Sequence, residues 1–206
     1  RKVSQFVAVE LSAIYHDVVK DRLYTDAPDS PRRRATQSAL YRLVTGLCQT
    51  LAPILAFTTD EAWEFIPGVK AGESVHLTDW QPLGFTRPAE EQVAWQKLME
   101  LRERALPELE KARQSKTIGK ALEARLTASG PAGYIGPMVS HEENLRELLN
   151  VSQLRLAESD LTDLRIEVVP ADGVKCARCW HWETDVGRNT GHPTICGRCL
   201  KTIGAT

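Results

Sequence analysis

The sequence predicts a mainly α-helical protein: a helical bundle, then a small α/β junction, then a C-terminal module that holds zinc through four cysteines. Three observations support this fold class. Apolar residues recur at steps of three and four over most of the first 110 residues, which is the period of an amphipathic helix. After residue 121 the pattern changes to alternation, which is typical of a strand. Two Cys-x-x-Cys pairs stand near the C-terminus.

The first predicted helix covers residues 3–24. Its apolar residues recur so that one face of a long helix is expected to be buried. The members of this face are Val3, Phe6, Val7, Leu11, Ile14, Val18 and Val19.

Two further helices are predicted before residue 68. Ser30 followed by Pro31 is typical of an N-cap and first helical residue, and Pro53 is expected to bend or end the helix that starts there. Thr58 and Glu61 have the spacing of a capping box, which predicts a short helix after them.

A Gly- and Pro-rich connector over residues 68–88 separates these helices from the α/β part. A helix follows with Leu98, Leu101 and Leu109 on its inner side, and Pro107 is expected to kink it. Strands are predicted over residues 122–127, 151–156 and 164–169, and a helix capped by Ser140 and Glu143 precedes the second of them. Residues 170–173 form the linker to the last module.

The C-terminal cysteines predict a structural zinc site. Cys176 and Cys179 are followed, sixteen residues later, by Cys196 and Cys199, and two such pairs bring four thiolates to the corners of a tetrahedron. Four thiolates leave the ion no open position, so a Lewis-acid role is not expected. Disulfides are the alternative, which the otherwise cysteine-poor sequence disfavours. The fifth cysteine, Cys48, is interpreted as a packed core thiol.

Local charge and aromatic side chains indicate contact with nucleic acid at this module. Arg178 and Arg198 stand between paired cysteines, and some of their charge offsets that of zinc with four thiolates. Trp180 and Trp182 suit stacking on bases, and the alternative is that both indoles only cover the metal.

Two more basic clusters are candidates for phosphate contact. Lys20-Asp21-Arg22 precedes a turn, and a run of three arginines follows it. The alternative is solvated charge at helix ends. The candidates for nucleic-acid contact are therefore Arg178, Trp180, Lys20, Arg22, Arg32, Arg33, Arg34 and Arg198.

Composition and charge limit the classes of protein to which the chain could belong. A formal net charge of -1 means that nucleic-acid contact has to come from local patches. No stretch approaches the roughly 18 apolar residues of a membrane span, and no signal peptide is recognisable, so we expect a soluble, cytoplasmic protein without membrane contact. The sequence starts at Arg1 without an initiator Met, and we expect a fragment of a longer chain.

No catalytic constellation is predicted. The sequence has no Gly-rich phosphate loop, no His-Glu-x-x-His and no Gly-x-Ser-x-Gly. His16, His76 and His141 are isolated and expected at the surface. His181 and His192 lie in the zinc module and are interpreted as packing or hydrogen-bonding residues, because four cysteines already fill the metal.

Three segments resemble the C-terminal part of bacterial isoleucyl-tRNA synthetases, which are class I enzymes. They are residues 15–24 (YHDVVKDRLY), 52–63 (APILAFTTDEAW) and 175–199, the cysteine-rich segment. The first two are shared with valyl, leucyl and related synthetases, and the cysteine-rich segment narrows the choice to the isoleucine enzyme. The resemblance covers essentially the whole chain.

The resemblance implies a helical anticodon-binding domain over residues 1–87, a kinked helix and small α/β junction over residues 88–170, and a four-cysteine zinc module over residues 171–206. It implies one structural Zn²⁺ per chain, a monomer, and tRNA(Ile) as the partner, together with catalytic and editing domains of the same polypeptide. The family joins isoleucine to its tRNA through an aminoacyl-adenylate made from ATP with Mg²⁺. The fragment would position the tRNA through its anticodon stem-loop.

This sequence departs from the complete enzymes in one important respect. The ATP-binding signatures His-x-Gly-His and Lys-Met-Ser-Lys-Ser are missing, so ATP and Mg²⁺ are expected only in the full-length enzyme, with catalysis upstream of Arg1. Pro107 also falls where the family usually keeps good helix formers.

Three alternatives remain at this point. A DNA glycosylase of the formamidopyrimidine type has a similar zinc finger, but it needs an N-terminal proline where this chain has Arg1. The chain could be the equivalent region of another class I synthetase. It could also be a zinc-stapled interaction module without a role in RNA binding.

Overall fold

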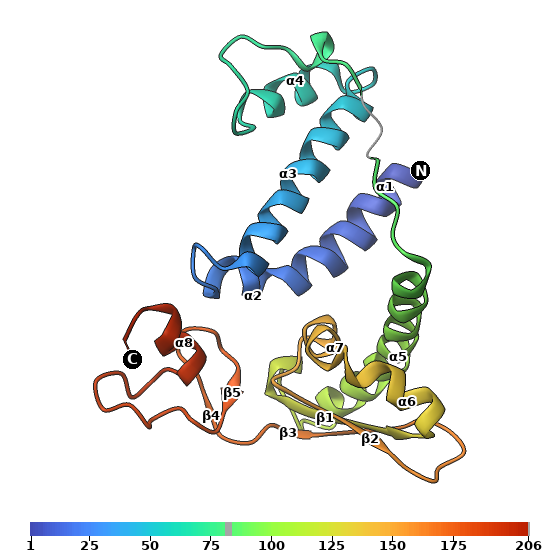
Figure 1. Cartoon of the computed structure of the whole chain (residues 1–206), viewed down its shortest axis with the longest axis vertical. Helices are drawn as coiled ribbons and strands as arrows, with labels where there is room; N and C mark the ends of the chain where they lie inside the picture. The colour runs from blue at the N-terminus through green and yellow to red at the C-terminus, as the bar shows by residue number, and fades with distance from the viewer. Residues whose placement is uncertain (81–83, 206) are drawn as a thin grey trace. The chain divides into compact units, whose positions relative to one another are not determined.

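The computed structural model describes residues 1–80 and 84–205 of the chain and divides it into two compact units. Unit 1 combines Arg1–Asp26 with the chain from Arg87 onward, and unit 2 is Ala27–Thr86 (Figure 1). Residues 81–83 of the predicted connector lie outside the described residues. The predicted boundaries at residues 87 and 170 rest on the sequence alone and stay a prediction. Within the described residues, no helix is both long enough and apolar enough to cross a membrane.

Unit 1 begins with one continuous helical segment in three parts. They are α1 (Lys2–Gln5), a wider π-helical stretch η1 (Phe6–His16) and α2 (Asp17–Thr25). Leu11 and Val19 are buried and Phe6 is partly buried, whereas Val3 and Val7 are exposed, so the first part of the predicted apolar face is only partly covered. Along η1, a π-helix turns less per residue than an α-helix, so residues at α-helical spacing do not stay on one face.

A three-stranded sheet forms the centre of unit 1. Its strands are β1 (Ala124–Gly130), β2 (Gln153–Glu158) and β3 (Arg165–Pro170), in the order β2-β1-β3. Strand β1 is parallel to β2 and antiparallel to β3, with Leu126 opposite Leu154 and Val168. All three predicted strands are therefore present, within two or three residues of the predicted bounds.

Helices α5 (Ala89–Gln114), α6 (Ala132–Val139) and α7 (Glu142–Leu149) lie on one side of this sheet (Figure 1). A short 3-10 turn, η3 (Ala121–Glu123), leads into β1. The buried residues of the helices and of β1 form the core of the unit. Its largest fully buried side chains are Leu98, Leu101, Leu126, Ile135, Met138 and Leu145. Helix α5 is continuous through Pro107.

Two predicted helix caps are wrong. Helix α4 (Ala56–Glu64) begins before Thr58, whose predicted capping position is already helical. Ser140 ends α6, and His141 is the N-cap of α7. Helix α6 was not predicted, because two glycines and Pro137 interrupt its helical pattern.

Unit 2 contains α3 (Pro31–Leu51), α4 and a 3-10 turn, η2 (Val75–Leu77). Helix α3 starts as predicted, with the Ser30 hydroxyl accepting a hydrogen bond from the Arg33 amide and Pro31 at the first position. Its core consists of Cys48, Ala52, Trp63, Ile66 and Val75. The interpretation of Cys48 as a packed core thiol is confirmed.

The chain ends in a small module that also belongs to unit 1. It is built from the antiparallel pair β4 (Val174–Lys175) and β5 (Trp182–Glu183) and the short helix α8 (Gly197–Thr202). The predicted fold class is thus confirmed: mainly helical, with a small mixed sheet and a C-terminal cysteine cluster.

Candidate metal centre and the surface beside it

The four cysteines of the terminal module lie together and are buried. One ligand atom from each of Cys176, Cys179, Cys196 and Cys199 lies within 4.8 Å of the others. The Sγ atoms of Cys176 and Cys199 are 3.8 Å apart, as are those of Cys179 and Cys196. A tetrahedral ion with Zn–S bonds of about 2.3 Å requires sulfur–sulfur edges of about 3.8 Å. The arrangement fits zinc and excludes disulfides, since all four cysteines are free.

The first cysteine pair sits in a tight turn between β4 and β5. The Cys176 amide donates to the His181 carbonyl (2.8 Å), and the Trp180 amide donates to the Cys176 carbonyl (2.9 Å). Trp180 closes this turn in the left-handed region, with φ 67°. Such a backbone conformation is uncommon outside glycine, so the surrounding turn has to hold it in place.

The second cysteine pair spans the start of α8. Cys196 is the N-cap residue, and the Gly197 amide donates to Asp185 Oδ2 (2.9 Å). A Cβ atom on Gly197 would lie 2.6 Å from that oxygen, so a side chain at this position would displace the Asp185 carboxylate. The Cys196 amide points at Cys176 Sγ (3.3 Å), which is the kind of donor that stabilises a thiolate.

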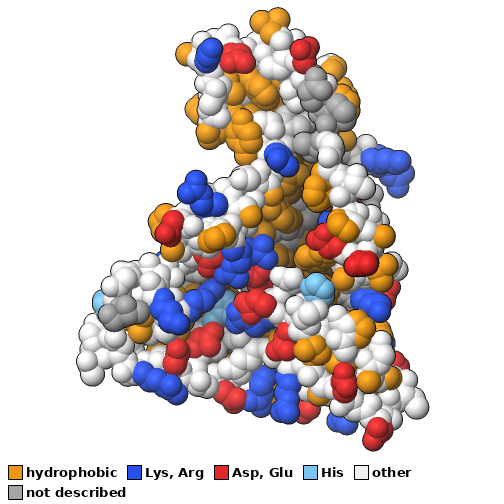
Figure 2. All heavy atoms as spheres, in the orientation of Figure 1, with side chains coloured by type: hydrophobic (Ala, Val, Ile, Leu, Met, Phe, Trp, Pro, Cys, Tyr) orange, Lys and Arg blue, Asp and Glu red, His pale blue; other side chains and the backbone are white. Residues whose placement is uncertain are grey.

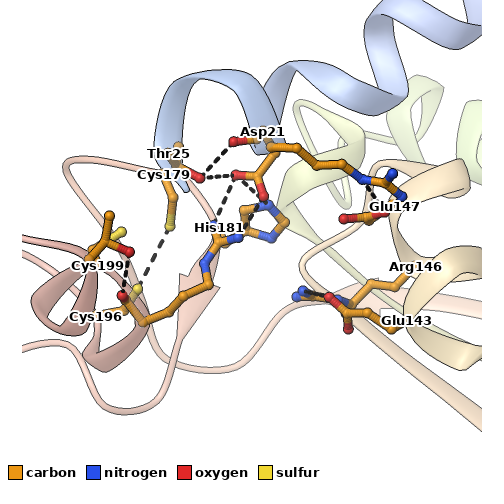
Figure 3. Close-up of polar contacts among 12 residues, drawn as sticks. Asp21, Thr25, Glu143, Arg146, Glu147, Cys179, His181, Cys196 and Cys199 are labelled. Carbon is orange, nitrogen blue, oxygen red and sulfur yellow. Dashed lines mark hydrogen bonds and ion pairs between the residues drawn. The ribbon is translucent and has the colours of Figure 1, made fainter. Parts of the chain in front are cut away.

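Two arginines of the module contact helix α2, whose Asp21 and Thr25 lie beside the module in Figure 3. Arg178 Nη1 donates to the carbonyl of Thr25, the last residue of α2 (2.6 Å), and lies 3.6 Å from Cys199 Sγ. Arg198 donates to both carboxylate oxygens of Asp21, at 2.5 and 2.9 Å. The module is therefore bound to the C-terminal end of α2 through two arginines.

Asp21 is ionised in this environment. Burial would raise its pKa, but the hydrogen bonds and charge of Arg198 outweigh burial and lower the pKa to about 2. His181 Nε2 lies 3.8 Å from the same carboxylate. Burial lowers the pKa of His181, although Asp21 opposes this, so the imidazole is neutral at pH 7.

A second set of contacts joins the module to the sheet. The Trp182 amide donates to Ser152 Oγ (2.7 Å). The side chain of Gln153 bonds the backbone of Asp172 in both directions, at 3.0 Å each, and Arg125 pairs with the Asp172 carboxylate. These contacts involve neither the cysteines nor α2.

A cavity of about 300 Å³ lies between α2 and the first cysteine pair. Lys20, Tyr24, Arg178, Trp180 and His181 contribute to its lining. Tyr24 and Trp180 remain 79% and 61% exposed, so two aromatic rings border a hollow beside the metal centre. Trp182, in contrast, is partly buried in β5.

Trp180 also has a cation beside it. Lys175 Nζ lies 5.7 Å from the centroid of the Trp180 ring, within the range of a cation–π interaction. The indole thus has a fixed backbone and a positively charged neighbour, and it leaves most of its surface in solvent. An exposed, well-anchored aromatic ring is suited to stacking on a planar ligand.

The predicted cationic candidates are divided between the two units. Lys20 pairs with Asp17 at the surface, and Arg22 pairs with the buried Glu147 of α7. Arg34 is exposed in the first turn of α3, where Arg32 and Arg33 also lie, but this turn is in unit 2. On the face seen in Figure 2, acidic and basic side chains are mixed around α2 and the terminal module.

Tyr24 and Asp21 at this cavity were not predicted, whereas His181 was expected in the module as a packing or hydrogen-bonding residue. Asp21 was grouped with Lys20 and Arg22 as part of a cationic cluster, although its carboxylate is the partner of Arg198. The missed residues approach the cysteine turn only through the tertiary fold. An acidic residue flanked by two basic ones was the available signal, because it indicates an ion-pair network as readily as a phosphate site.

Comparison with known families identifies the class of protein. The family model described as "Anticodon-binding domain of tRNA ligase" matches residues 1–128, and that described as "Zinc finger found in FPG and IleRS" matches residues 173–202. The chain belongs to the family of anticodon-binding domains of tRNA ligases. The zinc-finger match and the four-cysteine cluster together suggest a structural zinc ion.

The curated relatives compared with this chain are isoleucine–tRNA ligases. The isoleucine–tRNA ligase of Syntrophotalea carbinolica is 39% identical over 212 residues, covering 98% of this chain and 23% of the relative. That of Geobacillus thermodenitrificans is 40% identical over 214 residues, with the same shares. That of Exiguobacterium sibiricum is 39% identical over 207 residues, covering 97% of this chain and 22% of the relative. The chain spans about a quarter of their length and matches their C-terminal part.

Proposed function

We propose that the chain is the tRNA-binding C-terminal portion of an isoleucine–tRNA ligase that acts in the cytoplasm as a monomer. It holds tRNA(Ile) by the anticodon stem-loop, while catalytic and editing domains of the same polypeptide act on the acceptor end with ATP and Mg²⁺. The contribution of this portion is positioning, which lowers the entropic cost of bringing the tRNA to the active site. The family match over residues 1–128, with relatives along the whole chain, carries this proposal.

The zinc-finger match alone would not separate the alternatives. Its description names FPG as well as IleRS, so residues 173–202 are compatible with a DNA glycosylase. The anticodon-binding match and the ligase relatives over 97–98% of the chain favour the synthetase.

We propose that Cys176, Cys179, Cys196 and Cys199 hold one Zn²⁺ in a closed, structural site. The 3.8 Å sulfur spacing and the burial of all four side chains support this. Because the four thiolates complete the coordination, the ion would supply folding free energy rather than chemistry.

We propose that the cavity beside the metal centre is the RNA-facing part of the module. Trp180 would stack on a base, and Lys20 would meet a phosphate at the rim of the cavity. Arg32, Arg33 and Arg34 are proposed as a separate phosphate contact on unit 2. Arg178, Arg22 and Arg198 remain candidates for RNA contact, but each already donates to an acceptor within the protein.

Binding separates the alternatives directly. The zinc-loaded chain is titrated with an anticodon stem-loop of tRNA(Ile) and with an abasic-site DNA duplex of equal phosphate number, at equal salt. Preference for the stem-loop is expected. Preference for the duplex would support the glycosylase, and equally weak binding to both would support an interaction module without RNA contact.

The chain itself is expected to make no aminoacyl-adenylate, because it contains neither ATP-binding signature. The measurement is isoleucine-dependent exchange between ATP and pyrophosphate, with a complete isoleucine–tRNA ligase as the positive control. Exchange by the purified chain would mean that it holds a nucleotide site.

A further inference from the structure

We propose that Asp21 is a positioning residue, which holds Arg198 and thereby fixes the metal-bearing turn against α2 so that the cavity beside Trp180 keeps its shape. The proposal rests on the function proposed above. It also assigns Arg198 a role inside the protein in place of the predicted phosphate contact.

The geometry of the pair supports a fixed contact. The two terminal nitrogens of Arg198, Nη1 and Nη2, donate to the Asp21 carboxylate at 2.5 and 2.9 Å, and two such bonds fix the relative orientation of the two groups. The Asp21 side chain is only 18% exposed. Thr25 Oγ1 also donates to Asp21, at 2.9 Å, so the carboxylate is held on its own helix as well.

Arg198 connects its contact with Asp21 to the proposed metal centre. Arg198 lies between Cys196 and Cys199 in the first turn of α8, so its backbone is constrained by two proposed zinc ligands. A guanidinium that bonds one carboxylate with two nitrogens has little capacity left for the same bidentate contact with a phosphate. The structure therefore favours Arg198 as a link between α8 and α2.

The attachment of the module to α2 includes polar contacts of this kind. Among the described residues, the buried cluster of the module and the core of the junction share no member, so no continuous apolar core joins them. The sheet side is attached independently, through Ser152 and Gln153. Arg178, in the turn that carries Trp180, keeps its own bond to the Thr25 carbonyl of α2 (2.6 Å). Loss of Asp21 should therefore loosen this turn without detaching it, and leave the attachment to the sheet.

A double-mutant cycle tests the proposal in the full 206-residue chain, loaded with zinc. The variants are Asp21→Asn, Arg198→Gln and the double variant, and the readout is affinity for the tRNA(Ile) stem-loop at several salt concentrations. Asp163→Asn is the matched control, because it removes the partner of Arg104 (2.9 Å) in another part of unit 1.

Asp21→Asn is the most informative variant, because loss of the negative charge and loss of the positioning contact should change RNA affinity in opposite directions. Removal of a negative charge near RNA should by itself strengthen binding. The positioning role predicts weaker binding instead, by roughly 3-fold or more, with the double variant no weaker than the weaker single variant. The dependence on salt should be unchanged in Arg198→Gln, and Asp163→Asn should bind like the parent.

The contrary outcome is equally specific. If Asp21→Asn binds as well as the parent, while Arg198→Gln lowers the log-log salt slope by about 0.7 to 0.9, Arg198 is a phosphate contact and the proposal is wrong. Asp21→Glu keeps the charge and should retain more affinity than Asp21→Asn. Loss of zinc from both Asp21 variants would also overturn the proposal, because Asp21 would then support the metal site itself.

Amide hydrogen exchange tests the positioning role of Asp21 without relying on RNA binding. Asp21→Asn should speed amide exchange over residues 176–181 and leave exchange in β2 unchanged. If the parent does not bind tRNA, the proposed function fails, and exchange still decides the positioning role. Unchanged exchange over residues 176–181 would contradict it.

Discussion

The terminal module and the α/β junction beside it are stabilised in different ways. The junction buries a continuous apolar cluster drawn from three helices and β1, whereas the buried cluster of the module consists of the four cysteines, with Val186 and Ile195 packed against it. A segment of this size cannot bury enough apolar surface to fold by that means alone. This comparison indicates that the module depends on the zinc ion proposed for its four cysteines. The two regions should then respond differently to the same treatment.

Removal of zinc should have the largest effect, and on the module only. Structural zinc supplies about 10 to 16 kcal/mol of apparent binding free energy in small zinc domains, so a strong chelator should unfold residues 173–202. The junction should keep its strands and α5. Amide exchange resolved along the chain measures this. Protection of residues 176–199 in zinc-free protein would show that the module has another source of stability.

A core truncation should produce the converse result. Leu126→Ala removes a fully buried side chain from the central strand and should lower the free energy of unfolding of the junction by about 2 to 5 kcal/mol. Its zinc content should stay at one ion per chain. Denaturant titration and metal analysis provide the two readings. Loss of zinc while the junction is still folded would mean that the two regions are not independent.

Trp180→Ala should affect binding without affecting either source of stability. The indole is 61% exposed, so its loss should leave the zinc content and unfolding curve close to those of the parent. If the ring stacks on a base, affinity for the tRNA(Ile) stem-loop should fall by about 1 to 3 kcal/mol, with little change in salt dependence. Unchanged affinity would mean that Trp180 serves only the module.

Lys20→Gln should have the smallest effect on stability. The ion pair between Lys20 and Asp17 is at the surface, where such pairs contribute about 0 to 1 kcal/mol. As a phosphate contact at the rim of the cavity, Lys20 should account for about 0.7 to 0.9 of the log-log salt slope of tRNA binding. Stem-loop titrations across a salt series measure this slope. An unchanged slope would remove Lys20 from the RNA-facing surface.

Local signals in the sequence predicted most of the fold. Ser30 with Pro31, the alternation around Leu126 and the two cysteine pairs each depend on neighbours within a few residues, and each prediction matches the structure. The cap predicted at Thr58 failed because α4, although predicted, begins earlier, at Ala56. The cap predicted at Ser140 failed because α6, which ends there, was not recognised.

The surface beside the metal centre could be predicted only in part. Trp180 was predicted because it follows a cysteine pair, and the structure leaves it exposed. Tyr24 and Asp21 come from α2, far earlier in the sequence, and no local pattern relates them to the cysteines. For the same reason the ion pairs of Arg22 with Glu147 and of Arg198 with Asp21 were not predicted, although they decide which arginines have an acceptor inside the protein.

RNA binding near the C-terminus is proposed to depend on the metal centre, which holds the turn that carries Trp180. A direct test compares affinity for the tRNA(Ile) stem-loop in the zinc-loaded and the zinc-free chain, each with and without Trp180→Ala. Zinc removal is expected to weaken binding, and Trp180→Ala is then expected to have no further effect, because the turn that orients the indole is already lost. Equal affinity of the zinc-loaded and zinc-free chains would contradict this proposal.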